Sequence, residues 1–253
     1  MPGLSHKNPP TWLERNIIFR KLFLFRKLYL TRLKFSHYSG AGEDISIRKL
    51  FPGDYKGTFV DVGCYHPIKY NHTWMLYKKG WRGINIDIDD IKIELFDMVR
   101  RKDVNIACAV SDKPGMVKYY RAGLFSQINS LQETETSAME GYVTREIECK
   151  TLTSLIDVTR YKDAKIDFLN VDAEGHDFEV LSSLDFQRYE PSLIAVEIHE
   201  RTLDGVQNSK LYKLLQNFSY MLVGWCGETL LLANRQMQER LKNTHKRKKL
   251  GKR

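Results

Sequence analysis

The stretch TFVDVGCYHP, residues 58–67, shows most directly how this chain folds. Its first five residues form a mostly apolar, β-rich run, which is typical of a strand buried on both faces of a parallel sheet. Gly63 follows at once, and a glycine lets the backbone turn sharply and approach another group because no Cβ stands in the way. A buried strand that ends in a glycine turn predicts an open α/β sheet.

Runs of the same kind alternate with helical stretches along the chain, which is the pattern of a parallel sheet covered on both faces. The predicted strands are residues 58–62, 83–88, 104–110, 165–172 and 192–199. The predicted helices are at about residues 72–80, 90–101, 151–159, 176–184 and 207–217. Near the end, SYMLVGW and GETLLLANR flank a glycine turn and predict a closing β-hairpin. We therefore expect an α/β fold with a doubly wound, mostly parallel, seven-stranded Rossmann-like sheet.

Two further runs, residues 115–120 and 145–150, predict an additional strand pair, and the polar stretch 121–144 between them predicts a flexible loop. The whole chain of 253 residues, 42% of them hydrophobic, suits one substantial core. We assign this core to a domain at residues 36–234.

The charges of the chain are divided unevenly between this domain and its two ends. A basic-apolar helical segment, residues 1–35, holds eight Lys or Arg and one acid, and a basic tail, residues 235–253, holds nine and one. The ends therefore carry a net charge of +15, and residues 36–234 carry −6. Basic ends on an acidic body favour contact of the ends with an anionic surface over a nucleic-acid groove in the body.

The segment Trp12–Phe35 mixes large apolar residues with cations and predicts a helix. Its cations fall on several sides, so three partners stay open: its own domain, a second subunit or a membrane surface. The end at Lys242–Arg253 is either a solvated tail or a second contact with such a surface. Charges interrupt the N-terminal apolar segment too often for a signal sequence or a membrane span. The four cysteines are scattered along the chain and form no zinc or redox motif. We expect a cytoplasmic protein, peripheral to a membrane if the ends bind one.

The ends of the first two strands carry a nucleoside-binding pattern, because ligands of open α/β sheets bind beyond the carboxyl ends of the strands. The first strand leads to Asp61, Gly63 and Cys64, and the second ends in Asp87, whose carboxylate can accept both hydroxyls of a ribose. One glycine in place of G-x-G-x-x-G, and no phosphate loop, favour a nucleoside without phosphates. S-adenosylmethionine is the common cofactor of that kind. Alternatively, Asp87 caps the helix that begins near Asp90.

Polar side chains also follow the fourth and fifth strands, and neighbouring strand ends should bring them to one crevice. They are Asp172, Glu174, His176, Glu197 and His199. His199 or His176 would serve as general base, with Asp172 orienting it or binding the amino group of the cofactor. A divalent metal held by Asp172, Glu174 and Glu197 is the less favoured alternative. In a purely structural alternative, Asp172 or Glu174 caps the next helix and His199 is a buried, hydrogen-bonded histidine.

Several of these motifs resemble those of the FkbM-type S-adenosylmethionine-dependent methyltransferases. The similar stretches, in order from Thr58 to Asn234, are FVDVGCYHPIKY, GWRGINIDID, NIACAVSD, FLNVDAEGHDFEVLSSL and IAVEIH. The most specific piece is D-x-E-G-H-D-x-E-V-L at 172–181. The subgroup with this G-x-x-H-P loop usually continues with Ser-Asn-Thr, whereas this chain has Asn-His-Thr at 71–73.

The resemblance implies a class I methyltransferase fold and O-methylation, often of a sugar hydroxyl in a glycan, a glycolipid or a small natural product. By position it assigns Asp61 and Gly63 to the methionine end of the cofactor, Asp87 to the ribose, and Ala109 and Val110 to the adenine edge. Cys64 belongs to the same cofactor loop.

Two other classes of function remain open at this point. An RNA methyltransferase would explain the basic ends, but the acidic body lacks a basic-aromatic stripe. A non-catalytic binding or scaffold protein would be expected to have lost the cofactor residues, and Asp61, Gly63 and Asp87 are all present. The fold alone does not determine the acceptor.

Overall fold

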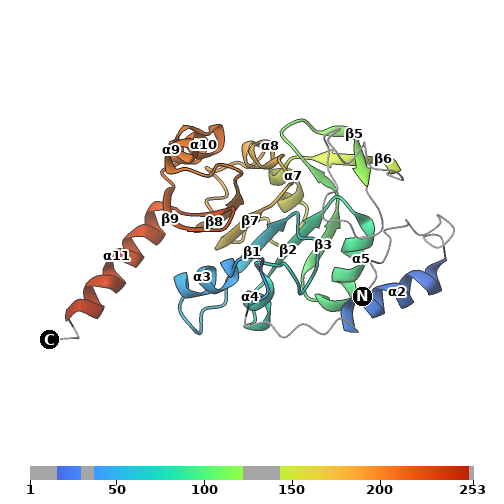
Figure 1. Cartoon of the computed structure of the whole chain (residues 1–253), viewed down its shortest axis with the longest axis horizontal. Coiled ribbons are helices and arrows are strands. Elements are labelled where there is room, and N and C mark those ends of the chain that lie inside the picture. The colour runs from blue at the N-terminus through green and yellow to red at the C-terminus, as the bar shows by residue number, and fades with distance from the viewer. Residues whose placement is uncertain (1–15, 30–36, 122–142, 251–253) are drawn as a thin grey trace.

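The computed structural model describes residues 16–29, 37–121 and 143–250, and Figure 1 shows how their helices and strands are arranged. The strands of the main sheet are Thr58–Val62 (β1), Arg82–Asp87 (β2), Val104–Ala107 (β3), Phe168–Val171 (β7), Leu193–Glu197 (β8), Met221–Cys226 (β9) and Thr229–Ala233 (β10). Their order in the sheet is β3-β2-β1-β7-β8-β10-β9. β10 pairs antiparallel with β8 and β9, and the other pairs are parallel. The seven-stranded, mostly parallel sheet and its C-terminal hairpin are confirmed.

The parallel strands form because both of their faces are buried. Successive residues of a strand point to opposite faces of the sheet. Val60 and Leu169 accordingly belong to one core cluster, while Phe59 and Phe168 belong to another. From β1 the chain proceeds outward to β2 and β3, and later from β7 to β8 in the other direction. The strand order therefore reverses between β1 and β7, which makes their carboxyl ends the expected place for a ligand.

Helices flank this sheet (Figure 1), and most of them lie where the sequence predicts them. Their bounds are Glu43–Leu50 (α3), Trp74–Lys78 (α4), Asp90–Val99 (α5), Leu152–Asp157 (α7), Asp177–Ser182 (α8), Leu203–Asn208 (α9) and Lys210–Asn217 (α10). α3 lies where no helix was predicted. The helix predicted at 207–217 is instead two helices, because Ser209 has an extended backbone and its Oγ accepts a hydrogen bond from Tyr212 N at 3.1 Å. Ser209 thus ends α9 and caps α10.

The strand predicted at 104–110 also differs, since it belongs to two sheets. β3 ends at Ala107, and β4 (Ala109–Val110) joins a three-stranded sheet of order β4-β6-β5 with β5 (Gly115–Arg121) and β6 (Val143–Lys150). Cys108 N still donates to Asp87 O at 3.1 Å, and from Ala109 onward the chain pairs with β6. The additional strand pair is confirmed, and the loop predicted between its strands lies, apart from its ends, outside the described residues.

The N-terminal helix α2 (Ile17–Tyr29) lies beside α5 (Figure 1). Leu24 and Leu28 are buried and pack with Ile91 and Leu95 of α5. Of the three partners left open by the sequence, the helix therefore meets its own domain with this face. The two ends of the predicted helix lie outside the described residues.

The C-terminal helix α11 (Arg235–Leu250) follows β10 directly and extends away from the sheet (Figure 1). Asn234 Oδ1 accepts a hydrogen bond from Met237 N at 2.9 Å, which caps the helix. Met237 is buried, and Leu241 packs against the same core cluster. The basic tail thus begins as a helix anchored on the domain. No helix within the described ranges is long and apolar enough to cross a membrane.

Candidate active site

The carboxyl ends of β1, β2 and β7 border a cavity of about 790 Å³, its open mouth included. The cavity lies at the reversal point of the sheet, which is the expected place for a ligand. The predicted site residues that line it are Gly63, Asp87, Ala109, Val110, Asp172, Glu174 and His176. The other predicted residues, which do not line it, are Asp61, Cys64, Glu197 and His199.

Gly63 allows β1 and β7 to approach each other at the edge of the cavity. Its φ is +73°, in the left-handed region that favours glycine, and a Cβ at this position would lie 1.7 Å from the carbonyl oxygen of Asp172. Its N–H donates to Ile86 O of β2 at 2.9 Å. The glycine predicted from the sequence is therefore required by the protein itself, and the turn that it makes forms part of the cavity wall.

Asp87 ends β2 and faces the cavity with much of its hydrogen-bonding capacity already in use. Its Oδ2 accepts from Tyr65 N at 2.9 Å, and its Oδ1 accepts from Asp89 N at 2.9 Å. Lys92 Nζ lies 3.5 Å from Oδ1. The cap of α5 is Asp89, which accepts from Ile91 N at 3.0 Å. Asp87 is therefore not the helix cap of the alternative interpretation, and its remaining acceptor sites face the cavity.

Asp61 lies beneath the cavity and not in its wall. Its Oδ1 accepts from Asn170 Nδ2 at 2.9 Å, and its Oδ2 accepts from Thr73 Oγ1 at 2.7 Å and from Asn71 Nδ2 at 3.2 Å. The side chain is buried. In this structure Asp61 connects β1, β7 and the segment before α4.

Arg100, at the end of α5, completes this buried network, and no sequence pattern singles it out. It is 0% exposed and donates to Thr73 Oγ1 at 2.8 Å and to Pro67 O at 2.9 Å. Its guanidinium lies 5.2 to 5.8 Å from the ring centroids of Phe59, Trp74, Tyr77 and Phe96. A basic residue at a helix end is ordinarily solvated, so nothing in the sequence marks this one as buried.

His176 lies at the end of the cavity where Ala109 and Val110 form the wall, the edge that the resemblance assigns to adenine. Its Nε2 is 3.0 Å from Ser111 Oγ, and its Nδ1 is 3.6 Å from a Glu179 oxygen. These contacts hold the ring next to the end of β4. Cys64 is buried behind the wall, where desolvation raises its pKa.

Carboxylates gather at one end of the cavity, where Asp172 and Glu174 line the wall and Asp177 lies close to both. Partial desolvation in the cavity, and then the charge of Asp172, raise the pKa of Glu174 to about 7, although the residue as a whole is exposed. Burial raises the pKa of Asp177 to about 6. A hydrogen bond from Ala173 N works against this shift, and the charge of Asp172 adds to it. Desolvation also raises the pKa of Asp172, and the nearby His72 and Lys92 partly offset this rise. This end of the cavity is therefore electrostatically suited to a cation.

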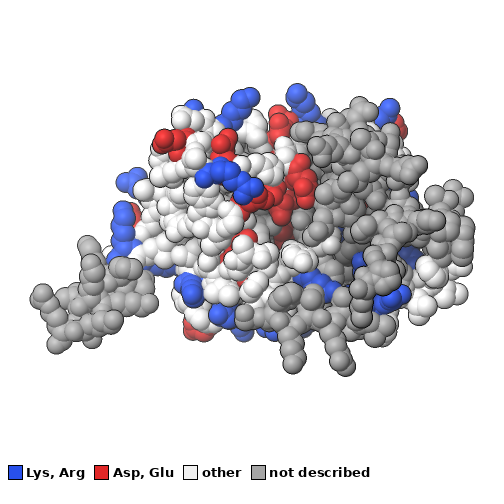
Figure 2. Space-filling view, in the orientation of Figure 1, with Lys and Arg blue, Asp and Glu red and all other residues white. Residues whose placement is uncertain are grey.

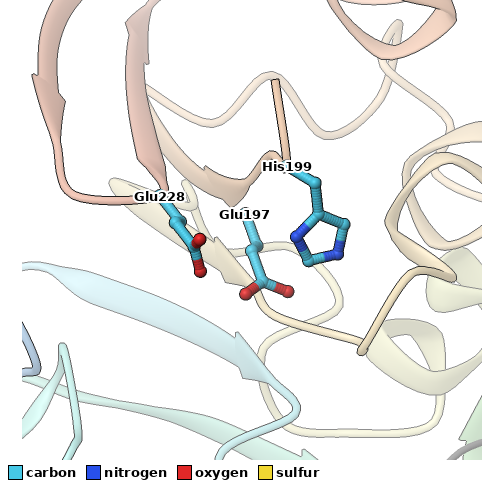
Figure 3. A group of neighbouring side chains, drawn as sticks. All are labelled: Glu197, His199 and Glu228. Atoms are coloured by element: carbon cyan, nitrogen blue, oxygen red, sulfur yellow. The ribbon is translucent and has the colours of Figure 1, made fainter. Parts of the chain in front are cut away.

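Glu197 and His199 lie beyond this end, together with Glu228, which the sequence analysis missed (Figure 3). One ligand atom of each lies within 4.8 Å of the others. His199 is exposed, so it is not the buried histidine of the structural alternative. Of the metal ligands considered from the sequence, Asp172, Glu174 and Glu197, only Glu197 belongs to this cluster. Glu228 lies in the hairpin turn, directly before β10, and the predicted hairpin was the one signal that could have placed it at this edge.

The strand order, with an antiparallel β10 between β8 and β9 and a ligand cavity at the reversal point, defines the class I methyltransferase fold. A profile of the family described as "Methyltransferase FkbM domain" matches residues 61–222, which is more than half of the chain. The chain belongs to the FkbM methyltransferase family. No curated protein is significantly similar to it in sequence.

Solved structures of methyltransferases are similar to this chain at low sequence identity. The methyltransferase FkbM from Methylobacillus flagellatus is 13% identical with a TM-score of 0.45, and the match covers 85% of this chain and 59% of that one. A TehB-like SAM-dependent methyltransferase from Corynebacterium glutamicum is 12% identical, with a TM-score of 0.42 and 86% and 97% covered. An O-methyltransferase from Bacillus cereus, in complex with SAH, is 10% identical, with a TM-score of 0.42 and 88% and 96% covered. The family assignment rests on the profile match.

Proposed function

We propose that this methyltransferase moves a methyl group from S-adenosylmethionine to a hydroxyl oxygen of a sugar, in a glycan, a glycolipid or a small natural product. The carbon–oxygen bond forms as the sulfur–carbon bond breaks, and the products are a methyl ether, S-adenosylhomocysteine and the proton of the hydroxyl. The observation that carries the proposal is the polarity of the cavity, with Asp87 placed for a ribose and the carboxylates of Asp172 and Glu174 placed for a cation.

This polarity matches S-adenosylmethionine better than a nucleotide. The cofactor has a sulfonium and an ammonium group near its methionine end, and both are attracted by carboxylates. A pyrophosphate in the same place would be repelled by Asp172 and Glu174. Lys92, the one lysine in the cavity wall as described, is already paired with Asp87. Asp172 is therefore proposed to meet the amino group of the cofactor, as the sequence analysis suggested.

The acceptor is proposed to lie against Glu197, His199 and Glu228, which are placed beyond the carboxylate end of the cavity. A sugar hydroxyl is a poor nucleophile while it is protonated, so a group that takes or weakens its proton should accelerate transfer by about 10²–10⁴-fold. Carboxylates also accept hydrogen bonds from neighbouring sugar hydroxyls. Figure 2 shows acidic side chains gathered on this face of the molecule near α8. Because they would repel a phosphate backbone, an RNA acceptor is disfavoured.

We further propose that the protein is cytoplasmic and binds an anionic membrane surface through its N-terminal helix. The face of α2 that does not pack on α5 exposes large apolar side chains, namely Ile17, Ile18, Phe19 and Leu22. Lys21 and Arg26 are exposed on the same helix. Apolar residues among cations are the composition of helices that lie in the headgroup region of anionic bilayers. A lipid-linked glycan would then be within reach of the cavity.

The test is a transfer assay with S-adenosylmethionine labelled at its methyl group, given to a lysate that is afterwards separated into glycan, lipid, RNA and protein. We expect label in the glycan or glycolipid fraction. An Asp87→Ala variant should lose the signal, and an Asp90→Ala variant, changed outside the cavity, should keep it. Label in RNA would favour the alternative acceptor, and absence of label from every fraction would favour a non-catalytic protein.

A further inference from the structure

The end of β8 and the start of β10 bring three metal-ligating side chains to one point. Glu197 and His199 are two residues apart along an extended segment, so their side chains leave it on the same side. Thr229 pairs with Glu197 in the antiparallel ladder, and Ile198 N donates to Glu228 O at 2.7 Å. Backbone hydrogen bonds therefore fix the position of Glu228 beside the other two. Figure 3 shows the three side chains directed toward a common space.

One oxygen of Glu197, a partly buried residue, lacks a hydrogen-bond partner. Its Oε2 is enclosed by protein, and no hydrogen-bond donor among the described residues reaches it. Buried polar atoms without a partner are rare because the loss of hydration is not compensated. Asp172 also contacts Glu197, but a second carboxylate supplies no donor unless the two share a proton. The position of Oε2 thus calls for a proton or a metal ion.

The charges around the cluster favour the metal ion. The carboxylates of Asp172, Asp177, Glu174 and Glu228 all lie close enough to Glu197 to act on its charge. Arg201 lies 2.6 Å from Glu228 Oε1, but its side chain is 77% exposed, so solvent screens its charge. An ion inside the cluster would offset several carboxylates at once, and Glu228 Oε2 is not used by the pair with Arg201.

We infer that Glu197, His199 and Glu228 bind a divalent cation at the acceptor end of the cofactor cavity. Two carboxylate oxygens and an imidazole nitrogen suit Mn²⁺, Mg²⁺ or Zn²⁺. Three protein ligands are fewer than such an ion takes, which leaves positions for oxygens of the acceptor. On the proposed function, the ion would lower the pKa of the acceptor hydroxyl, and His199 would act as a ligand and not as a free base.

The test is binding of Mn²⁺ to the full-length protein after treatment with EDTA and dialysis, without cofactor or acceptor. Electron paramagnetic resonance of the free ion and calorimetry should show one saturable site per chain. Glu228→Gln and His199→Asn should each weaken binding at least tenfold, while Glu200→Gln, an acid adjacent in the sequence and outside the cluster, should bind like the wild type. Mn²⁺ should also raise the unfolding midpoint of the wild type more than that of the two cluster variants.

Absence of saturable binding up to 1 mM Mn²⁺, or equal binding by all four proteins, would overturn the inference. Since the assay contains no cofactor, its result is independent of methyl transfer. Binding without any transfer of label would support the site and contradict the proposed function. Methyl transfer that persists in EDTA, in a protein that does not bind Mn²⁺, would support the proposed function and contradict the metal site. His199 would then remain a free base.

Discussion

Asp87 should hold the ribose, because its oxygens accept two backbone N–H groups and still face the cavity. Asp87→Ala removes a charged acceptor and should weaken S-adenosylmethionine binding by about 1.5–3 kcal/mol. Calorimetry with S-adenosylmethionine and S-adenosylhomocysteine measures this directly, and NAD should not bind. Asp90→Ala serves as the control. Equal affinities of the wild type and Asp87→Ala would remove the ribose assignment.

Glu174 should make cofactor preference depend on pH. The residue as a whole is exposed, but partial desolvation of its carboxyl in the cavity, and then Asp172, raise its pKa to about 7, so the side chain becomes negative as the pH rises through 7. In the absence of ligand this ionisation costs stability between about pH 4.5 and 7, because the unfolded state ionises first. It should, however, attract the sulfonium of S-adenosylmethionine, which S-adenosylhomocysteine lacks. The ratio of the two affinities should therefore rise about fivefold from pH 6 to 8, which corresponds to ~1 kcal/mol.

Calorimetric titrations of EDTA-treated protein with both ligands at each pH measure this ratio. Glu174→Gln, which cannot ionise, should give a ratio independent of pH. If the variant keeps the pH dependence of the wild type, the titrating group is another one, and the charge of Glu174 has no part in recognising the sulfonium.

The sequence located residues along the edge of the sheet better than it predicted their direction. Knowing that a strand ends near Asp61 and Cys64 does not tell which of the two points into a cavity, and both lie behind its wall. Glu228 was missed for another reason. The rule that ligands bind at carboxyl ends applies to parallel strands, whereas antiparallel β10 brings its amino end to the same edge.

At the level of elements, Arg100 at the end of α5 forms hydrogen bonds with Pro67 and Thr73 in the segment that follows β1. Removing its charge in Arg100→Met leaves the acceptors of Pro67 and Thr73 without their donor and leaves Asp61 without the cation that faces it. Breaking one partner of such a buried set costs about 3–5 kcal/mol of unfolding free energy. Urea denaturation should show this loss, and Arg101→Met, the exposed neighbour, should unfold like the wild type. A loss below ~1 kcal/mol would show that the network contributes little.

The elements themselves were mostly predictable, because a strand buried on both faces needs a mostly apolar run and a glycine or polar turn after it. Their partners were not predictable to the same degree. Residues 104–110 form one apolar run, but the change of partner at Cys108 depends on β6, which lies about forty residues later. The break at Ser209 was readable in principle, since a serine before an apolar helical run is a favoured N-cap.

For the molecule as a whole, the sequence established that the charge lies at the ends, and the structure shows how the first of these ends is presented. α2 uses Leu24 and Leu28 to pack on α5, which fixes the helix and leaves its other face outward. A docked helix cannot turn its apolar side chains inward. Exposed Ile18 and Leu22 therefore have to meet either water or a partner, and the nearby cations make an anionic bilayer the best match.

Purified protein should accordingly float with anionic liposomes at low salt and not with neutral ones. Attraction of about 1 kcal/mol per basic residue near the surface is largely screened at 0.5 M salt, where the Debye length is roughly 4–5 Å, so binding should then be lost. Ile18→Ser with Leu22→Ser, and separately Lys21→Gln with Arg26→Gln, should each reduce binding at least tenfold. Val158→Ser with Met221→Ser changes two equally exposed apolar residues elsewhere and should have no effect. If all three double variants bind like the wild type, α2 is not the part of the protein that contacts the liposomes. If RNA at matched salt displaces the liposomes, the basic ends bind a nucleic acid instead.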